Sequence, residues 1–257
     1  MTGADMKRLA HGLFGKPETP DFEMPFDGEL LSLAEMVKAM LELSDQALGL
    51  YAWSADPLAG KFSLTQKTDY MTQAIRCGRE EAKLIQAEYQ TADPDQLAGL
   101  LGLKINEPEL PVGGGHVIFA QYVEPDEVTI FTDAVRKAEV LIREENLGEL
   151  LEEVDVRRLL LAHEIFHAIE YRKSESIFTK TEKVELWRKP FSNRSGLIAL
   201  SEIAGMAFAG ELLGISFSPY VFDVILMYGY NKEAAAALFE EIMELAAAAE
   251  EAEEMQC

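Results

Sequence analysis

The chain has 257 residues, of which 48% are hydrophobic and 26% charged, and its formal net charge is −22. This length suits one large domain or two small ones, with a substantial buried core. The acidity argues against binding to nucleic acid or to an anionic membrane surface, because both need a basic patch. The two cysteines, Cys77 and Cys257, are too isolated for a disulfide framework, so we expect a reducing compartment.

The first residues carry no long apolar stretch, so no secretory signal is expected. No segment approaches the ~20 apolar residues that are needed to cross a bilayer. From these two observations we expect a cytoplasmic protein.

The N-terminal third is predicted to be helical after an extended arm. Residues 1–26 are rich in proline, glycine and charge, as such an arm requires. From Gly28 to Ala52, leucine and methionine recur at helical spacing, which predicts one amphipathic helix. A second helix is expected over 66–91, and a short third one starts at Asp93-Pro94 and stops at Gly102.

Strands are predicted only between residues 103 and 131. Leu103–Ile105 is a short candidate, and the stretch His116–Tyr122 follows three glycines. A turn at 124–126 leads into Val128–Phe131. We expect these segments to form a small antiparallel sheet.

The rest of the chain is predicted to be mainly helical. Asp133 could cap a helix that ends near Ile142. The next helix would begin at 147–151 and end at Arg172-Lys173, with acidic residues early and basic residues late. Residues 174–195 are polar and irregular, with Val184–Trp187 extended. Three more helices are expected at 196–213, from Ser218-Pro219 to Gly229, and from Lys232 onward.

Residues 163–167 form a pentad that reads His-Glu-Ile-Phe-His, an H-E-x-x-H pattern inside an apolar run. On a helix, His163 and His167 project from one face and can hold one divalent metal ion. Glu164 between them can act as a general base toward a water on that metal. Since the chain has only four histidines, two of them around a glutamate are hard to ascribe to coincidence.

Glu202 is the candidate third ligand, because catalytic zinc usually takes three protein ligands and keeps one open position. It lies on an otherwise apolar helix, where a carboxylate is costly to bury unless it is paired or metal-bound. The small residues Gly205 and Ala209 would let two helices approach closely. A solvent-facing glutamate in a first helical turn is the alternative. Glu170 is expected to be exposed or to support a ligand, because it lies a further turn along the pentad helix.

Three blocks of the sequence carry a resemblance to a known family. They are residues 96–105, the strand Val128–Phe131 followed by residues 161–167, and residues 202–213. Together they resemble the ImmA/IrrE family of metallopeptidases, whose E-x-x-A-N-x-F-A helix the third block is similar to. The resemblance, which spans about residues 66–220, implies a gluzincin-type site with one Zn²⁺ on His163, His167 and Glu202.

The sequence also departs from that family's pattern. Phe166 stands where a small residue is usual, Met206 replaces the usual asparagine, and the expected proline is absent until Pro219. The interval before the pentad is long and charged. We therefore expect a divergent branch, whose substrate is not the DNA-binding repressor best known for the family.

The expected fold is α+β and mainly helical: a zincin-like domain over residues 27–257. A small antiparallel sheet would lie beside the H-E-x-x-H helix. Residues 66–220 would form the family-like core, 27–65 an N-terminal helical extension, and 221–257 the C-terminal helices.

The expected activity is zinc-dependent hydrolysis of a peptide bond in a peptide or protein substrate. Such a substrate could add as a strand to Val128–Phe131. The oxyanion needs a further donor, for which His116, Tyr220 and Arg194 are candidates, together with Tyr228 and Tyr230. The alternative interpretation is a turn-flanking histidine for His116, and core or rim aromatic residues for the tyrosines.

Three alternatives stay open. Phe166 and Met206 would suit a metal-binding regulatory or scaffold protein without activity. Glu164 and His167 also spell the E-x-x-H of a di-iron bundle, but neither His11 nor His116 has a glutamate three residues before it. Finally, a helix could spell the pentad by chance, and both histidines would then need other buried partners.

Overall fold

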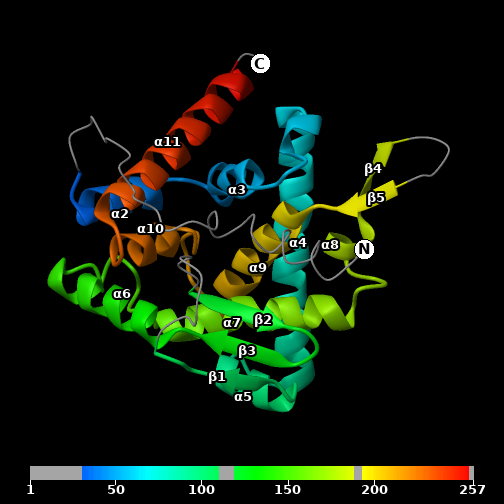
Figure 1. The fold of residues 1–257 in the computed structure, drawn as a ribbon, viewed down its shortest axis with the longest axis horizontal. Coiled ribbons are helices and arrows are strands. Elements are labelled where there is room, and N and C mark those ends of the chain that lie inside the picture. The colour runs from blue at the N-terminus through cyan, green and yellow to red at the C-terminus, as the bar shows by residue number, and fades with distance from the viewer. Residues whose placement is uncertain (1–30, 110–118, 188–192, 255–257) are drawn as a thin grey trace.

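The computed structural model describes residues 31–109, 119–187 and 193–254. Over these residues the chain is mainly helical, with a small three-stranded sheet and a separate two-stranded hairpin (Figure 1). The arm expected at 1–26 lies outside the described residues. None of the described helices combines the length and apolar composition that a membrane crossing requires.

The single helix predicted from Gly28 to Ala52 is wrong, because two helices occupy this region. Helix α2 (Leu33–Leu41) starts at a capping box between Ser32 and Glu35. Helix α3 (Asp45–Ser54) starts at a second cap, where the Ser44 hydroxyl accepts from the Ala47 amide at 3.1 Å. The apolar spacing continues across the break, but a serine that caps a new helix ends the old one. A 3-10 turn, η1 (Ala59–Lys61), follows.

The next two predicted helices are confirmed. Helix α4 (Leu64–Tyr89) opens on a capping box between Ser63 and Gln66. Helix α5 (Pro94–Leu100) opens on Asp93, whose carboxylate accepts from the Gln96 amide at 3.0 Å. Gly102 follows in the left-handed region, with φ of 68°.

The small sheet is mixed, which corrects the antiparallel expectation. Its strands are β1 (Lys104–Asn106), β2 (Ala120–Val123) and β3 (Glu127–Ile130), in the order β1-β3-β2. A tight turn joins β2 to β3, so this pair is antiparallel. Both β1 and β3 run opposite to β2, so β1 runs parallel to β3, which lies between the other two strands.

Strand addition at Val128–Phe131 is ruled out by this order. Residues 127–130 form the central strand, with β1 on one side and β2 on the other. Its backbone groups are already committed to those neighbours. Within the described sheet, an incoming peptide could pair only with β1 or β2, which are the outer strands.

Helix α6 (Thr132–Glu144) forms where it was expected, but its N-cap is Phe131 rather than Asp133. The Asp133 carboxylate lies in the first turn, where it accepts from Arg136 at 2.7 Å and from the Tyr230 hydroxyl at 3.0 Å. Asp133 therefore ties α6 to the start of the last helical segment.

The pentad lies on α7 (Val156–Arg172), which begins later than predicted. Asp155 is its N-cap and accepts from the Arg158 amide at 2.9 Å. Glu152 and Glu153 just before it have φ of 54° and 53°, in the left-handed region. A right-handed helix cannot run through such residues, so the turn at 147–151 is separate from α7.

The stretch expected to be irregular contains regular structure. After α8 (Phe178–Thr181), strand β4 (Lys183–Trp187) pairs antiparallel with β5 (Asn193–Gly196) in a hairpin that extends away from the helices (Figure 1). The extension of Val184–Trp187 is thereby confirmed. The three final helices follow as predicted: α9 (Ile198–Leu213), α10 (Val221–Tyr228) and α11 (Lys232–Glu254).

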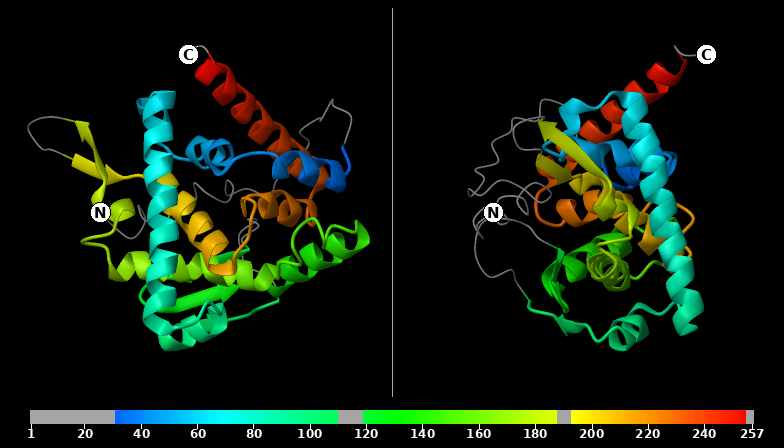
Figure 2. Two further views of the ribbon diagram at one scale, coloured as in Figure 1. Left: turned by 180° about the vertical axis from the view of Figure 1, so that it is seen from behind. Right: turned by 90° about the vertical axis from the view of Figure 1, so that its right-hand side faces the viewer.

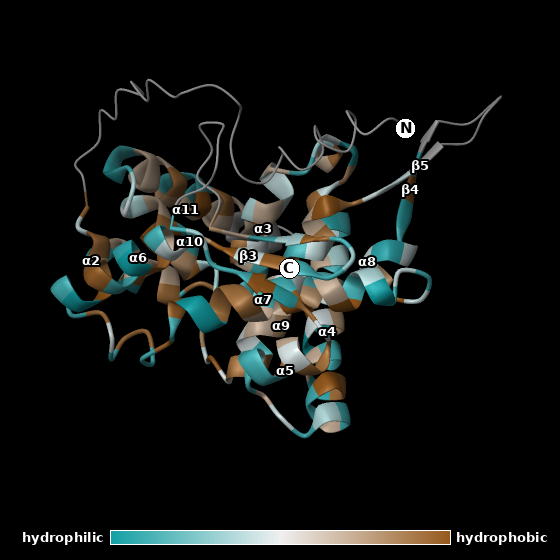
Figure 3. Ribbon diagram, turned by 60° about the horizontal axis from the view of Figure 1, so that its bottom comes forward, coloured by the Kyte–Doolittle hydropathy of each residue, from teal (hydrophilic) through white to brown (hydrophobic). Residues whose placement is uncertain are grey.

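Helices α4, α7 and α9 form the centre of the molecule. Helix α9 packs against both α4 and α7, while β2 and β3 cover another side of α7 (Figures 1 and 2). Figure 3 shows hydrophobic residues along α7 and a largely hydrophilic α8 at the periphery. The pentad is therefore held inside the core between a helix and a sheet.

Candidate metal centre

The H-E-x-x-H pentad is buried on nearly all sides of α7. Leu161 and Ala162 before it and Ile165 within it have no exposed surface, and His163 and Glu164 are only 8% and 6% exposed. Buried polar groups of this kind need partners. The Nε2 atoms of both histidines have polar partners in the space between α7 and α9, whereas Nδ1 of His163 has none among the described residues.

Three side chains converge there. The Nε2 atoms of His163 and His167 lie 3.0 Å apart. The Glu202 carboxylate on α9 places Oε2 3.2 Å from His163 Nε2 and Oε1 3.6 Å from His167 Nε2. A tetrahedral zinc ion with bonds of about 2.0–2.1 Å holds its ligand atoms about 3.3 Å apart. The observed separations bracket that value, and this group could hold one metal ion.

The close approach of α7 and α9 depends on Gly205, one turn after Glu202. A Cβ atom placed on Gly205 would lie 2.9 Å from Cε1 and 3.1 Å from Nδ1 of His163. The sequence predicts close helix packing at this small residue. Here it makes room for the imidazole itself.

Replacing Gly205 with alanine should weaken zinc binding about 10- to 100-fold, as changes beside metal ligands typically do. The added methyl would push His163 out of line with His167 and Glu202. Zinc affinity, measured by competition with a chromophoric chelator, tests this. Gly210→Ala on the same helix is the control, because its Cβ would meet only the Pro219 side chain, at 3.3 Å. Equal zinc affinity in Gly205→Ala and Gly210→Ala would contradict the prediction.

His167 is oriented from its other side by buried polar residues. Its Nδ1 atom lies 3.3 Å from the Ser201 hydroxyl and 3.6 Å from Glu170 Oε2. Ser201 also donates to that Glu170 oxygen at 2.7 Å, and Lys180 Nζ lies 2.8 Å from it. A carboxylate behind the imidazole fixes the ring and leaves Nε2 free for a metal.

Glu170 is thus a supporting carboxylate, which is one of the two roles predicted for a residue too far along the helix to bind metal; the other, an exposed glutamate, is wrong. It is 2% exposed. Burial by itself would raise its pKa, but His167 and Lys180 outweigh this effect and lower the pKa to about 2. Ser201 and Lys180 were missed. Ser201 directly precedes Glu202 and could have been noticed, whereas nothing local marks Lys180.

The cluster carries an excess of negative charge that suits a cation. Burial alone would lower the pKa of His167, but the nearby carboxylates, led by Glu202 and Glu170, raise it to about 9. Burial raises the pKa of Glu164, and the two histidines oppose this only in part. A field that draws a proton onto an imidazole also attracts a divalent ion to the same atoms.

Glu164 faces the sheet. A backbone hydrogen bond links its carboxylate to Tyr122 in β2, and its charge interacts with those of His163, His167 and Glu202. Because β2 is an outer strand, this contact places the carboxylate beside the sheet edge.

Among the candidate oxyanion donors, Tyr220 lies near the cluster. It is 4% exposed, and its hydroxyl has no hydrogen-bond partner among the described residues. Burial raises its pKa, and the charges of Glu202 and Asp223 add to the effect. A buried hydroxyl without a partner is a donor available to a ligand.

The other described candidates have other surroundings, and one candidate cannot be placed. Arg194 lies in β5, opposite Glu185 in the projecting hairpin, and His116 is outside the described residues. The Tyr230 hydroxyl donates a hydrogen bond to Asp133, and the Lys137 ammonium group lies 3.7 Å from the centre of its ring. Tyr230 therefore has a structural role. Lys232 lies over the Tyr228 ring at 5.1 Å.

Two residues near the cluster come from the predicted N-terminal extension and C-terminal helices, outside the family-like core expected at 66–220. Burial raises the pKa of Asp223 on α10 to about 7, with His163 opposing the shift and Glu202 reinforcing it. Tyr51 on α3 packs edge-on against Tyr220, with ring centroids 6.3 Å apart. Neither lies in a recognisable motif, and only the fold brings them to the site.

The two residues that departed from the family pattern are engaged in packing. Phe166 is fully buried, 5.7 Å from the Phe208 ring and 6.0 Å from the His167 ring. Met206 lines a hollow of about 230 Å³ between α9 and the loops that flank α3 and α10.

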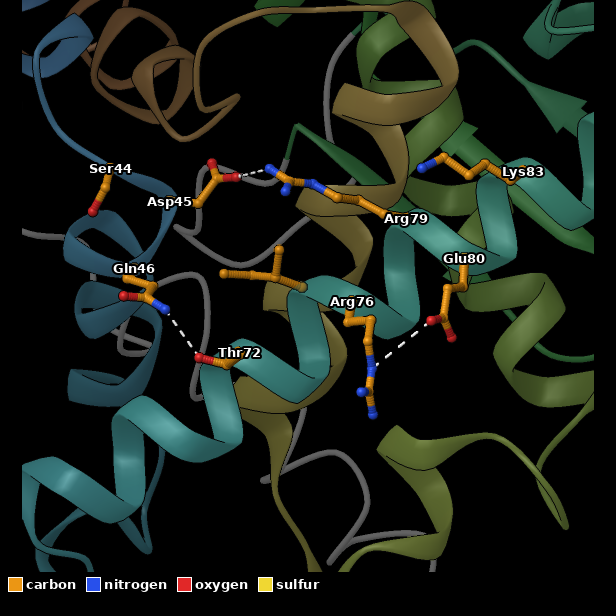
Figure 4. A pocket seen from close by; sticks show the side chains of 9 residues that line it. Ser44, Asp45, Gln46, Thr72, Arg76, Arg79, Glu80 and Lys83 are labelled. Atoms are coloured by element: carbon orange, nitrogen blue, oxygen red, sulfur yellow. Dashed lines mark hydrogen bonds and ion pairs between the residues drawn. The ribbon is translucent and has the colours of Figure 1, made fainter.

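A second hollow, of about 530 Å³, lies between α3 and α4 (Figure 4). It is apart from His163, His167 and Glu202, the candidate metal-binding group. Three basic residues line it, but Arg79 pairs with Asp45, Arg76 pairs with Glu80, and Lys83 pairs with Glu211. Its charges are thus compensated within the protein.

The metal-binding group is therefore the feature of the described structure with the most definite chemistry. Comparison of the chain with models of protein families, with curated proteins and with solved structures finds no match. The function has to be argued from the residues of the site.

Proposed function

We propose that the protein is a zinc-dependent peptidase with a zincin-like fold, in which His163, His167 and Glu202 hold one Zn²⁺. The observation that carries the proposal is the convergence of three side chains beside the H-E-x-x-H glutamate. The two Nε2 atoms lie 3.0 Å apart, and the Glu202 carboxylate lies 3.2 Å from that of His163 and 3.6 Å from that of His167. Two imidazoles and one carboxylate form the donor set of several zinc peptidases, with a further position open to water and substrate.

In such a peptidase Glu164 would be the general base and Tyr220 would stabilise the oxyanion. Bound zinc supplies Lewis acidity, which activates water at neutral pH and polarises the scissile carbonyl. Glu164 accepts the proton from the attacking water and delivers it to the leaving amine. Burial raises the pKa of the Glu164 carboxyl group, which favours the protonated form in which it carries that proton. The buried Tyr220 hydroxyl is the proposed donor to the oxyanion.

Strand β2 is the proposed place for an extended peptide. It is an outer strand, and its residue Tyr122 bonds Glu164 through the backbone. A peptide that adds to this edge would pass beside the general base. This replaces the strand at Val128–Phe131, which is enclosed by its neighbours.

Metal binding without turnover is a second candidate function, and limited access to the site favours it. The side chains of His163, Glu202 and His167 are only 10%, 14% and 16% exposed in the described structure. A regulatory or scaffold protein would need the ion only to hold α7 and α9 together.

The test is to measure bound zinc and peptide hydrolysis in wild type and in Glu164→Gln. We expect one zinc per chain in both proteins, and an activity about 10²- to 10⁴-fold lower in the variant, because only the proton transfer is removed. Glu149→Gln, an exposed change before α7, is the control and should keep full activity. Zinc without turnover in wild type would establish the second candidate, and full activity in Glu164→Gln would exclude Glu164 as the base.

A further inference from the structure

Helix α9, which carries Glu202, has no N-terminal cap of its own. Its N-cap residue is Leu197, which offers no side-chain hydrogen bond. The first turn is nonetheless buried, since Leu197 and Ala199 are 2% and 0% exposed. The free amides at a buried helix start need acceptors, because no water satisfies them.

Asp56 supplies the acceptor from another part of the chain. It lies between α3 and η1, and it is 5% exposed. Its Oδ2 accepts from the Ala199 amide at 3.0 Å, in a buried hydrogen bond, while Oδ1 accepts from the Leu58 amide at 2.8 Å. A carboxylate here also stabilises the positive end of the helix dipole.

We propose that Asp56 is a positioning residue for the metal centre, an inference that rests on the zinc site proposed above. The bond to Ala199 holds the turn that contains Ser201 and Glu202. Glu202 provides the third donor, and Ser201 contacts both His167 and Glu170. A helix rotates by about 100° per residue, so unwinding of this turn would move both side chains out of the cluster.

The rest of α9 has its own anchors from Ala204 onward, which confines the effect of Asp56 to the residues before it, Glu202 included. Gly78 lets α4 pack directly on the backbone at Ala204, and Gly205 lies against His163. The segment before α4 thus completes the centre: Asp56 sets the start of α9, while Tyr51 packs on Tyr220.

The experiment compares the full-length chain with Asp56→Ala and Asp56→Asn. Zinc affinity is measured by chelator competition, and the ligand geometry is read from the visible absorption of the Co²⁺-loaded protein, with folding checked by near-UV circular dichroism. We expect zinc to bind about 10- to 100-fold more weakly in Asp56→Ala, with an altered Co²⁺ spectrum. Asp56→Asn keeps one acceptor oxygen, so its zinc affinity should lie between those of wild type and Asp56→Ala.

Asp93→Ala is the matched control. Asp93 also caps a helix start, accepting from the Gln96 amide at 3.0 Å, and it pairs with Arg158 at 2.8 Å, but it takes no part in the metal-binding group. It should lower thermal stability yet leave zinc affinity and the Co²⁺ spectrum unchanged. Comparing Asp56→Ala with Asp93→Ala distinguishes the loss of a positioned metal ligand from the general effect of losing a helix cap.

The inference is overturned if Asp56→Ala loses stability like Asp93→Ala but binds zinc as wild type does, with the same Co²⁺ spectrum. Should Asp56→Ala fail to fold, Asp56→Asn decides in the same way, because unchanged affinity and spectrum would again overturn it. Wild type that binds zinc without hydrolysing peptides would refute only the peptidase proposal. Wild type that binds no zinc would refute both proposals before any variant is made.

Discussion

Glu202→Ala should abolish most of the stabilisation that zinc gives to the folded protein. The variant loses the carboxylate that lies 3.2 Å from His163 Nε2 and 3.6 Å from His167 Nε2. Two imidazoles on one helix would remain, and they hold zinc far more weakly than three ligands do. We expect an affinity loss of three orders of magnitude or more.

The effect can be read as a thermal shift. A ligand at 1,000 times its Kd stabilises the folded state by about 4 kcal/mol. In a chain of this size, that corresponds to a rise in Tm on the order of 10 °C. Wild type should show such a rise when zinc is added, whereas Glu202→Ala should show little at the same zinc concentration.

Glu211→Ala is the control for this prediction, because it removes another glutamate from the same helix. Glu211 pairs with Lys83 at 3.5 Å and is not part of the metal-binding group. Its zinc-induced shift should match that of wild type. A full shift in Glu202→Ala would show that zinc is held by other residues.

Gly78→Ala should destabilise the fold by at least about 3 kcal/mol, more than most overpacking changes cost. A Cβ at this position would lie 2.1 Å from the carbonyl oxygen of Ala204, and 2.9 Å from the Phe208 amide nitrogen. Both are backbone atoms of α9, so no side-chain rotation relieves the overlap. Helices α4 and α9 would have to separate along the contact that supports Glu202.

Urea denaturation measures this loss, and Gly99→Ala provides the control. Gly99 also lies inside a helix, α5, but a Cβ there would meet nothing within 4 Å. Alanine is the better helix former by about 0.8–1 kcal/mol, so Gly99→Ala should be neutral or stabilising. If Gly78→Ala proves as stable as wild type, the close packing of α4 on α9 is not as described.

Helix starts and most helical segments could be predicted from the sequence, because their signals are local. The Asp93-Pro94 start of α5 and the amphipathic length of α4 were correctly located. The breaks between helices were harder to predict. Ser44 caps a new helix inside a continuous apolar pattern. The left-handed backbone of Glu152 and Glu153 delays the start of α7. In both places the apolar periodicity persists while the backbone changes direction.

The sheet was only half predictable. The turn between β2 and β3 implies an antiparallel pair, since a tight turn reverses the chain. The pairing of β1 with β3 joins segments that are distant in the sequence, so no local signal indicates it. That placement makes Val128–Phe131 a central strand and shifts the available edge to β2.

The sequence by itself determined the pair of imidazoles, because the pitch of an α-helix places residues four apart on one face whatever surrounds them. It also indicated Glu202, because a carboxylate buried on an apolar helix costs free energy unless it is paired or bound to a metal ion. Only the tertiary structure decided that Glu202 reaches those imidazoles, that Ser201 and Glu170 orient His167, and that Asp56 caps α9 across 143 residues of sequence. These contacts follow from how α4 and α7 pack on α9, and such packing depends on residues far apart in the chain.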